Sequence, residues 1–143
     1  MRILVVDNGG QWTHREWRVL RDLGVETEII PNTTPVDKIV ADGLVLSGGS
    51  PRVGLNAQAM GLCGEYIDKC GVPVMGICAG HQFMAVHLGG KAGPSKVPEF
   101  GKVLITIDDS DDIFKDLPDT LVAWESHNDE VTDLPPAFVS LSQ

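Results

Sequence analysis

The sequence predicts an α/β domain, a three-layer sandwich in which helices cover both faces of a mainly parallel sheet. Within residues 1–90, short apolar runs rich in branched side chains alternate with segments whose apolar residues recur at helical spacing. Each run ends in a turn that contains glycine or proline. The length of 143 residues and the 43% apolar composition fit a single domain over residues 1–143.

The alternation of apolar runs and helical spacing over residues 1–90 predicts four strands and four helices in strict alternation. The expected strands are residues 3–6, 25–30, 44–46 and 72–77. The expected helices are residues 12–23, 36–40, 57–70 and 80–88. Gly24 is placed to cap the first helix, Pro31 stops the second strand and Pro35 begins the short second helix. Gly61 and Gly64 weaken the third helix without removing its pattern.

After Gly90 the pattern changes. Three strand-like runs, residues 103–107, 121–124 and 138–141, are separated by acidic and proline-containing turns. We expect these runs to form a strand-rich C-terminal extension of the same sheet.

Charge and composition exclude several classes of partner. The net charge of −9 argues against a surface for nucleic acid or anionic lipid. No apolar run approaches the ~20 residues of a membrane span, and the N-terminal run meets charge and glycine too soon for a secretory signal. Three cysteines in such a chain do not predict a disulfide framework. We therefore expect a cytoplasmic protein with no nucleic-acid or membrane partner.

Cys78 lies at the predicted corner between the fourth strand and the fourth helix. Gly76 and Gly80 flank it in the pattern G-x-C-x-G, the cysteine version of a nucleophile elbow. A helix N-terminus favours the reactive thiolate, and the N–H of Ala79 points to where an oxyanion would form. The loop over residues 47–49, at the end of a neighbouring strand, offers a second backbone donor. The pattern indicates a nucleophile.

The remaining candidates carry weaker signals. Cys63 and Cys70 lie seven residues apart on one expected helix, which places them in the core. Cys78 and His81 have no second pair at ligand spacing, so we expect no metal site. The 47–54 loop lacks the ending of a P-loop, and the 7–12 turn lacks G-x-G-x-x-G, so neither predicts a nucleotide.

Four segments in order carry a resemblance to a known family. GICAGHQ (76–82) resembles the nucleophile motif of class I glutamine amidotransferases, and LSGGSP (46–51) is similar to their oxyanion loop. VVDNGGQWTHREWR (5–18) and AWESHNDEVTDLP (123–135) resemble segments of the amidotransferase part of GMP synthetases, with archaeal two-subunit enzymes the nearest type. The resemblance covers nearly the whole chain and implies a flavodoxin-like fold.

The resemblance also implies roles for matching residues. Cys78 would attack the carboxamide of L-glutamine, and the N–H groups of Gly49 and Ala79 would hold the oxyanion. The residues implied to bind glutamine are Gly48, Gln82, Ser126, His127 and Asn128. Ammonia would pass to a separate ATP-pyrophosphatase subunit that aminates XMP, with ATP and Mg²⁺ on that subunit and no cofactor on this chain.

The sequence departs from the family at one point. The family's histidine and glutamate belong to a motif like G-[VI]-Q-F-H-P-E, which does not occur in residues 1–143. Two explanations are open: an amidotransferase truncated at its C-terminus, which the retained elbow favours, or a domain that binds glutamine or a regulatory partner without turnover. Another class I amidotransferase, such as the anthranilate synthase component, and an unrelated cysteine-elbow protein are further alternatives.

Overall fold

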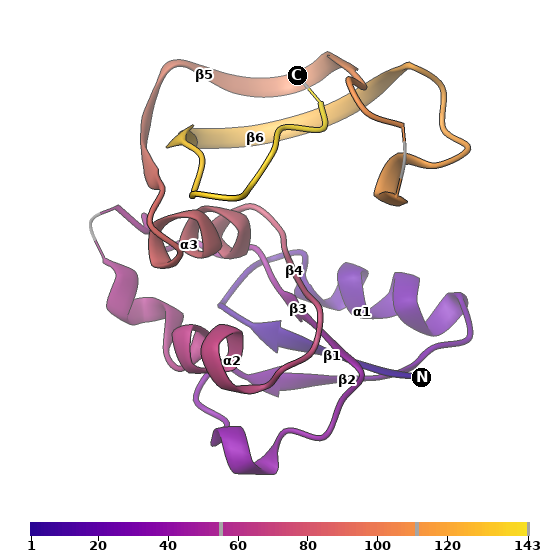
Figure 1. The fold of residues 1–143 in the computed structure, drawn as a ribbon, viewed down its shortest axis with the longest axis vertical. Coiled ribbons are helices and arrows are strands. Elements are labelled where there is room, and N and C mark those ends of the chain that lie inside the picture. The colour runs from indigo at the N-terminus through magenta and orange to yellow at the C-terminus, as the bar shows by residue number, and fades with distance from the viewer. Residues whose placement is uncertain (55, 111, 143) are drawn as a thin grey trace.

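The computed structural model describes residues 1–54, 56–110 and 112–142, without the side chains of residues 97–99 and 112. These described residues form two sheets and three α-helices (Figure 1). The strands of the main sheet are β1 (Arg2–Asp7), β2 (Glu26–Pro31), β3 (Gly43–Leu46) and β4 (Val74–Gly76). The helices are α1 (Thr13–Asp22), α2 (Cys63–Lys69) and α3 (Ala79–His87), with 3₁₀ turns η1 (Val36–Lys38), η2 (Ala57–Met60) and η3 (Asp112–Phe114). Two long strands, β5 (Lys91–Thr106) and β6 (Thr120–Asp133), follow α3.

The main sheet is parallel, with the strand order β2-β1-β3-β4. The chain returns across β1 between β2 and β3, and α1 lies on one face of the sheet while α2 and α3 lie on the other (Figure 1). The strand order reverses beside β1, and the carboxyl ends of β1, β3 and β4 therefore meet at one edge of the sheet. In such a fold this edge is where a ligand site is expected.

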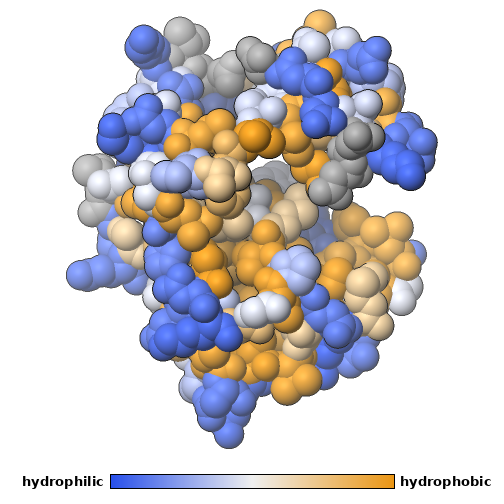
Figure 2. Space-filling model, in the orientation of Figure 1, coloured by the Kyte–Doolittle hydropathy of each residue, from blue (hydrophilic) through white to orange (hydrophobic). Residues whose placement is uncertain are grey.

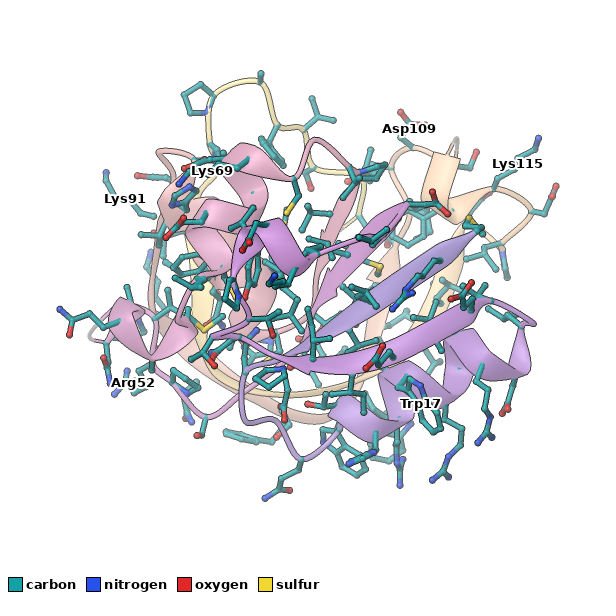
Figure 3. All side chains as sticks on the ribbon, turned by 90° about the horizontal axis from the view of Figure 1, so that it is seen from below. Trp17, Arg52, Lys69, Lys91, Asp109 and Lys115 are labelled. Carbon is teal, nitrogen blue, oxygen red and sulfur yellow. The ribbon has the colours of Figure 1, made fainter. Side chains whose placement is uncertain are left out.

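The core lies between the main sheet and the helices α2 and α3. Leu44, Leu46, Met60 and Tyr66 are fully or almost fully buried in it. On the other face, α1 is fixed by Trp17, whose indole N–H donates to the Thr27 carbonyl at 3.2 Å (Figure 3). Both faces of the sheet are thus covered, as the alternating pattern predicts.

Two predicted helices are shorter than expected. The 36–40 segment forms only the single turn η1, and the 57–70 segment is divided into η2 and α2. The division falls at Gly61, whose φ of 55° leaves the helical region. A side chain there would collide with Asn32, since a Cβ atom would lie 2.4 Å from the Asn32 carbonyl oxygen. Packing against the turn after β2 therefore interrupts the helix.

The predicted C-terminal extension of the same sheet is wrong. β5 and β6 pair antiparallel in a separate two-stranded sheet, which lies over the carboxyl edge of the main sheet (Figure 1). The strand expected over residues 138–141 does not form; the only pairing described nearby is an isolated bridge between Ile107 and Ser142. The space-filling view is hollowed between the β5–β6 sheet and the rest of the molecule (Figure 2).

No helix among the described residues is long and apolar enough to cross a lipid bilayer.

Candidate active site

Cys78 occupies a strained corner between β4 and α3. Its φ of 49° and ψ of −111° lie outside the regions that residues other than glycine usually adopt. The side chain is exposed while the next residue, Ala79, is buried at the first position of α3. The corner therefore presents the sulfur to solvent at the carboxyl edge of the sheet.

The two flanking glycines are required by close backbone contacts. A Cβ atom on Gly76 would lie 2.6 Å from the His81 backbone nitrogen, and one on Gly80 would lie 2.2 Å from the Leu46 carbonyl oxygen. Real Cβ atoms do not approach backbone so closely. The glycines let β4 turn into α3 while α3 packs directly on β3, and this confirms the predicted elbow.

The loop after β3 packs against both the elbow and the turn after β1. A Cβ atom on Gly48 would touch the Cys78 Cβ at 3.4 Å, and one on Gly49 would lie 2.4 Å from the Asn8 carbonyl oxygen. Beneath the loop, the buried Ser47 hydroxyl accepts the Asn8 N–H at 3.0 Å. The Asn8 side-chain amide in turn donates to the Ser47 carbonyl at 3.0 Å. These bonds hold the two glycines of the loop beside the cysteine.

A cavity of about 810 Å³ opens over this arrangement. Its floor is made by the turn after β1, the loop after β3 and the elbow, and its roof is made by β6. It is lined by Gly9, Gly10, Gln11, Trp12, Glu16, Gly48, Gly49, Ser50, Ile77, Cys78, His81, Gln82, Trp124, Glu125, Ser126, His127, Asp129, Glu130 and Val131. An exposed thiol, bare backbone amides and several polar side chains thus converge on one space.

The roof is tied to the floor through Asp129. The Arg52 guanidinium, which follows the glycine loop, donates to the two Asp129 carboxylate oxygens at 2.6 and 3.1 Å. These hydrogen bonds lower the pKa of the buried Asp129 carboxyl below its ordinary value. The Gln82 side-chain N–H donates to the Asp129 carbonyl at 2.8 Å. Gln82 is therefore held with its amide nitrogen toward the roof.

Two further roof residues face the cavity as a pair. The His127 Nε2 atom and a Glu125 carboxylate oxygen are hydrogen-bonded to each other. The two residues are separated by two positions on β6 and so lie on the same face of the strand.

Glu16 is an acid on the floor of the cavity. It lies one turn into α1, and one carboxylate oxygen, Oε1, accepts the Gly48 N–H at 3.4 Å. The other oxygen, Oε2, is buried without a hydrogen-bond partner. Burial raises the pKa of the Glu16 carboxyl, the Gly48 N–H opposes the rise, and the nearby Asp7 carboxylate adds to it.

The structure gathers most of the residues that the sequence singles out. Six of them line the cavity: Gly48, Gly49, Cys78, Gln82, Ser126 and His127. Ala79 is buried and follows Cys78 as the first residue of α3, whereas Asn128 is exposed, and neither is among the lining residues.

Other site residues were missed by the sequence reasoning. The signal for Glu16 was present, since it occupies a polar position within the apolar stripe of the first helix. Arg52 and Asp129 are 77 residues apart, and no local pattern joins them. Cys63 and Cys70 are away from the cavity, and burial raises the pKa of the Cys63 thiol to about 12. Among the described residues, no group of three His, Cys, Asp or Glu side chains is arranged to hold a metal ion.

Comparison with known proteins gives one consistent family. Residues 4–143 match the model of the family "Glutamine amidotransferase class-I". The chain is 53% identical over 140 residues to the glutamine-hydrolyzing GMP synthase subunit of Thermoplasma volcanium, covering 97% of this chain and 69% of that protein. It is 48% identical to the corresponding GMP synthase subunit of Thermococcus kodakarensis, covering 99% of this chain and 76% of that protein.

Solved structures agree with these matches. A crystal structure described as a GMP synthase subunit of Thermoplasma acidophilum superposes with a TM-score of 0.92 at 48% identity, covering 99% of this chain and 72% of that one. A glutamine amidotransferase of Thermotoga maritima superposes with a TM-score of 0.78 at 20% identity, over 99% of this chain and 66% of that one. The second likeness concerns the fold alone.

Proposed function

The chain belongs to the class I glutamine amidotransferases, and we propose that it is the glutamine-hydrolysing subunit of a GMP synthase. The observation that carries the proposal is the strained Cys78 corner packed against the Gly48–Gly49 loop on the floor of one cavity. The relatives named as glutamine-hydrolyzing GMP synthase subunits, at up to 53% identity, support this choice within the family.

The proposed chemistry begins at Cys78. Its sulfur attacks the carboxamide carbon of L-glutamine, and the carbonyl oxygen becomes an oxyanion that the N–H groups of Gly49 and Ala79 stabilise. Collapse of this intermediate breaks the C–N bond and leaves a γ-glutamyl thioester, and the nitrogen departs as ammonia with the proton that the Cys78 thiol gave up. Water then hydrolyses the thioester, which gives glutamate and restores the thiol.

The remaining site residues have binding roles in this proposal. Gln82, fixed through its amide nitrogen to the Asp129 carbonyl, keeps its amide oxygen for the substrate. Gly48 and the β6 residues Ser126 and His127, which line the cavity, supply the other contacts to glutamine, whereas Asn128 does not line it and is given no contact. The family's H-P-E histidine has no counterpart in residues 1–143, so the proton transfers are assigned to no residue of this sequence.

The partner in the proposal is a separate ATP-pyrophosphatase subunit that uses ATP and Mg²⁺ to activate XMP and receives the ammonia. No cofactor is assigned to the present chain. A reducing cytoplasm, in which the exposed Cys78 thiol stays free, is part of the same proposal.

The first test is covalent labelling with 6-diazo-5-oxo-norleucine, a glutamine analogue whose ketone replaces the carboxamide. The Cys78 sulfur bonds to the diazo carbon, the thiol proton moves to that carbon and N₂ leaves. We expect one adduct by intact mass on the wild-type chain and none on Cys78→Ala. Absence of an adduct on folded wild-type protein would overturn the proposal.

The second test distinguishes turnover from binding alone. The chain is mixed with an archaeal ATP-pyrophosphatase subunit, XMP, ATP and Mg²⁺, and GMP formation is followed with glutamine or with ammonium as nitrogen donor. Glutamine-dependent GMP that is lost in Cys78→Ala supports the amidotransferase function. Labelling at Cys78 together with GMP formation from ammonium only identifies a glutamine-binding module instead.

A further inference from the structure

We propose that Ser47 and Glu16 are positioning residues that hold the peptide bond between Gly48 and Gly49 with its N–H turned into the cavity. The inference rests on the proposed function, because the direction of this N–H matters only if an oxyanion forms beside Cys78. Neither side chain needs to touch the substrate in this role.

The Gly48–Gly49 peptide needs such support because both of its residues are glycines. Glycine allows a wide range of backbone angles, so this peptide could rotate and point its carbonyl oxygen, instead of its N–H, at the developing negative charge. A carbonyl oxygen in that position would repel an oxyanion. The loop therefore works as an oxyanion donor only when one orientation is imposed on it.

Ser47 imposes the orientation from beneath. Its hydroxyl donates to the Gly48 carbonyl oxygen at 2.9 Å. The peptide bonds of the described chain are trans, so the Gly49 N–H points opposite to that carbonyl and hence away from the buried Ser47. Gly49 itself lines the cavity.

The hydroxyl of Ser47 has its own position fixed. As an acceptor it receives the Asn8 N–H at 3.0 Å. The Thr13 hydroxyl lies 3.2 Å away, and its own single hydrogen has a closer acceptor in the Asp7 carboxylate at 3.1 Å. The single hydrogen of the Ser47 hydroxyl has its closest acceptor in the Gly48 carbonyl at 2.9 Å. The network makes Ser47 a rigid donor.

Glu16 holds the preceding peptide from the side of α1. Its Oε1 atom accepts the Gly48 N–H, so the two polar atoms of Gly48 are bound to two different side chains. Rotation of either peptide would break one of these bonds. The adjacent Asn8–Gly10 turn leaves little room, because a Cβ atom on Gly10 would lie 2.3 Å from the Gly48 carbonyl oxygen.

The test compares two reagents on the same sulfur. 6-Diazo-5-oxo-norleucine places a carbonyl in the oxyanion position, whereas iodoacetamide alkylates an accessible thiol without using that position. Rates at Cys78 are followed by intact mass with peptide mapping for wild type, Ser47→Ala and Glu16→Ala. Ser140→Ala, an exposed hydroxyl that does not line the cavity, and Asp22→Ala, an exposed acid of the same helix, are the matched controls.

For Ser47→Ala we expect the maximal labelling rate with the glutamine analogue to fall about tenfold to a hundredfold, part of the loss seen when one oxyanion donor is removed. The concentration for half-maximal labelling and the iodoacetamide rate should stay within about twofold of wild type, which a general loss of structure would not permit. In Glu16→Ala the maximal labelling rate should fall only about threefold to tenfold, because the hydrogen bond from the Gly48 N–H to Glu16 is long, at 3.4 Å. Glu16→Gln should recover most of that rate, because it keeps an acceptor oxygen.

Two outcomes would overturn the inference. In one, both reagents slow equally in Ser47→Ala and Glu16→Ala; in the other, both variants label with the analogue as fast as their controls. Either outcome with normal labelling of wild type leaves the proposed function standing. No labelling of wild type counts against the proposed function itself.

Discussion

Gly80→Ala is the sharpest test of the elbow, because the structure gives the size of the perturbation. The added Cβ atom would lie 2.2 Å from the Leu46 carbonyl oxygen and 2.9 Å from the Leu46 Cβ atom, whereas ordinary contact begins at 3.4 Å. The first of α3's turns would therefore move away from β3 by about 1.2 Å, the difference between 3.4 and 2.2 Å. That carbonyl also accepts the Ile77 N–H at 3.0 Å, so the strand before the elbow is disturbed as well.

Two opposing effects set the expected stability. Replacing glycine by alanine inside a helix gains about 1 kcal/mol, while overpacking costs about 1–3 kcal/mol and more when backbone must move. With an overlap of this size the cost exceeds the gain, and we expect a net loss of about 2 kcal/mol. For a chain of this length that lowers Tm by about 6–10 °C.

The effect on reactivity should exceed the effect on stability. A displacement near 1 Å between a nucleophile and its oxyanion donors can cost about a hundredfold in rate. Labelling of Cys78 by 6-diazo-5-oxo-norleucine should fall by that factor in Gly80→Ala. Gly93→Ala is the matched control, since a Cβ atom there meets nothing within 4 Å. Equal Tm and equal labelling in the two variants would refute the close-packing account of the elbow.

Three more outcomes follow from the same site. Arg52→Ala should raise the analogue concentration for half-maximal labelling about tenfold, because Asp129 loses a partner that binds both of its carboxylate oxygens. Arg52→Lys should recover only part of that affinity, since lysine cannot make the same two hydrogen bonds. An unchanged concentration in Arg52→Ala would exclude a role for the Arg52–Asp129 ion pair in binding. Folding raises the pKa of Glu16 above its ordinary value of 4.5. The ionised carboxylate therefore lowers the stability of the fold when the pH is above the raised pKa, and this loss disappears as the pH falls toward 4.5. Glu16→Gln should therefore raise Tm at pH 7–8, with a gain over wild type that shrinks toward pH 4.5 in thermal melts; a gain independent of pH would contradict this. Because burial raises the pKa of Cys63 to about 12, Ellman's reagent at pH 8 should modify Cys78 in folded protein and Cys63 only after denaturation, and reaction of native Cys63 would show that its burial is transient.

The residues around the elbow were predictable because their constraints are local. Gly76 and Gly80 stand two positions from Cys78, and a tight turn between a strand and a helix leaves few other sequences. The four parallel strands were predictable for the same kind of reason, since β3 (Gly43–Leu46) is buried along its whole length and reads as a continuous apolar run. A strand that is buried on both faces needs apolar residues at every position, so it can be recognised in the sequence.

The second sheet was not predictable in this way. β5 contains Pro94 and Gly101, which normally argue against a strand. In a two-stranded sheet each strand has an open edge, so proline can be accommodated, and the register shifts between Pro94 and Glu99. Here the pairing of two segments far apart in the sequence determines where the strands lie, and local propensity therefore predicts the wrong strand boundaries.

The site is built from both sheets, and each sheet holds its part of the site in a different way. The nucleophile and the glycine loop belong to the parallel sheet, where Asn8, Ser47 and the glycines are packed backbone to backbone. The roof belongs to the second sheet and meets the floor at Asp129, which binds Arg52 through its carboxylate and Gln82 through its carbonyl. Mutations in the first group should therefore change the maximal rate at Cys78, because they move the oxyanion donors. Mutations in the second group should change the affinity for glutamine, because they release Gln82 from its fixed orientation.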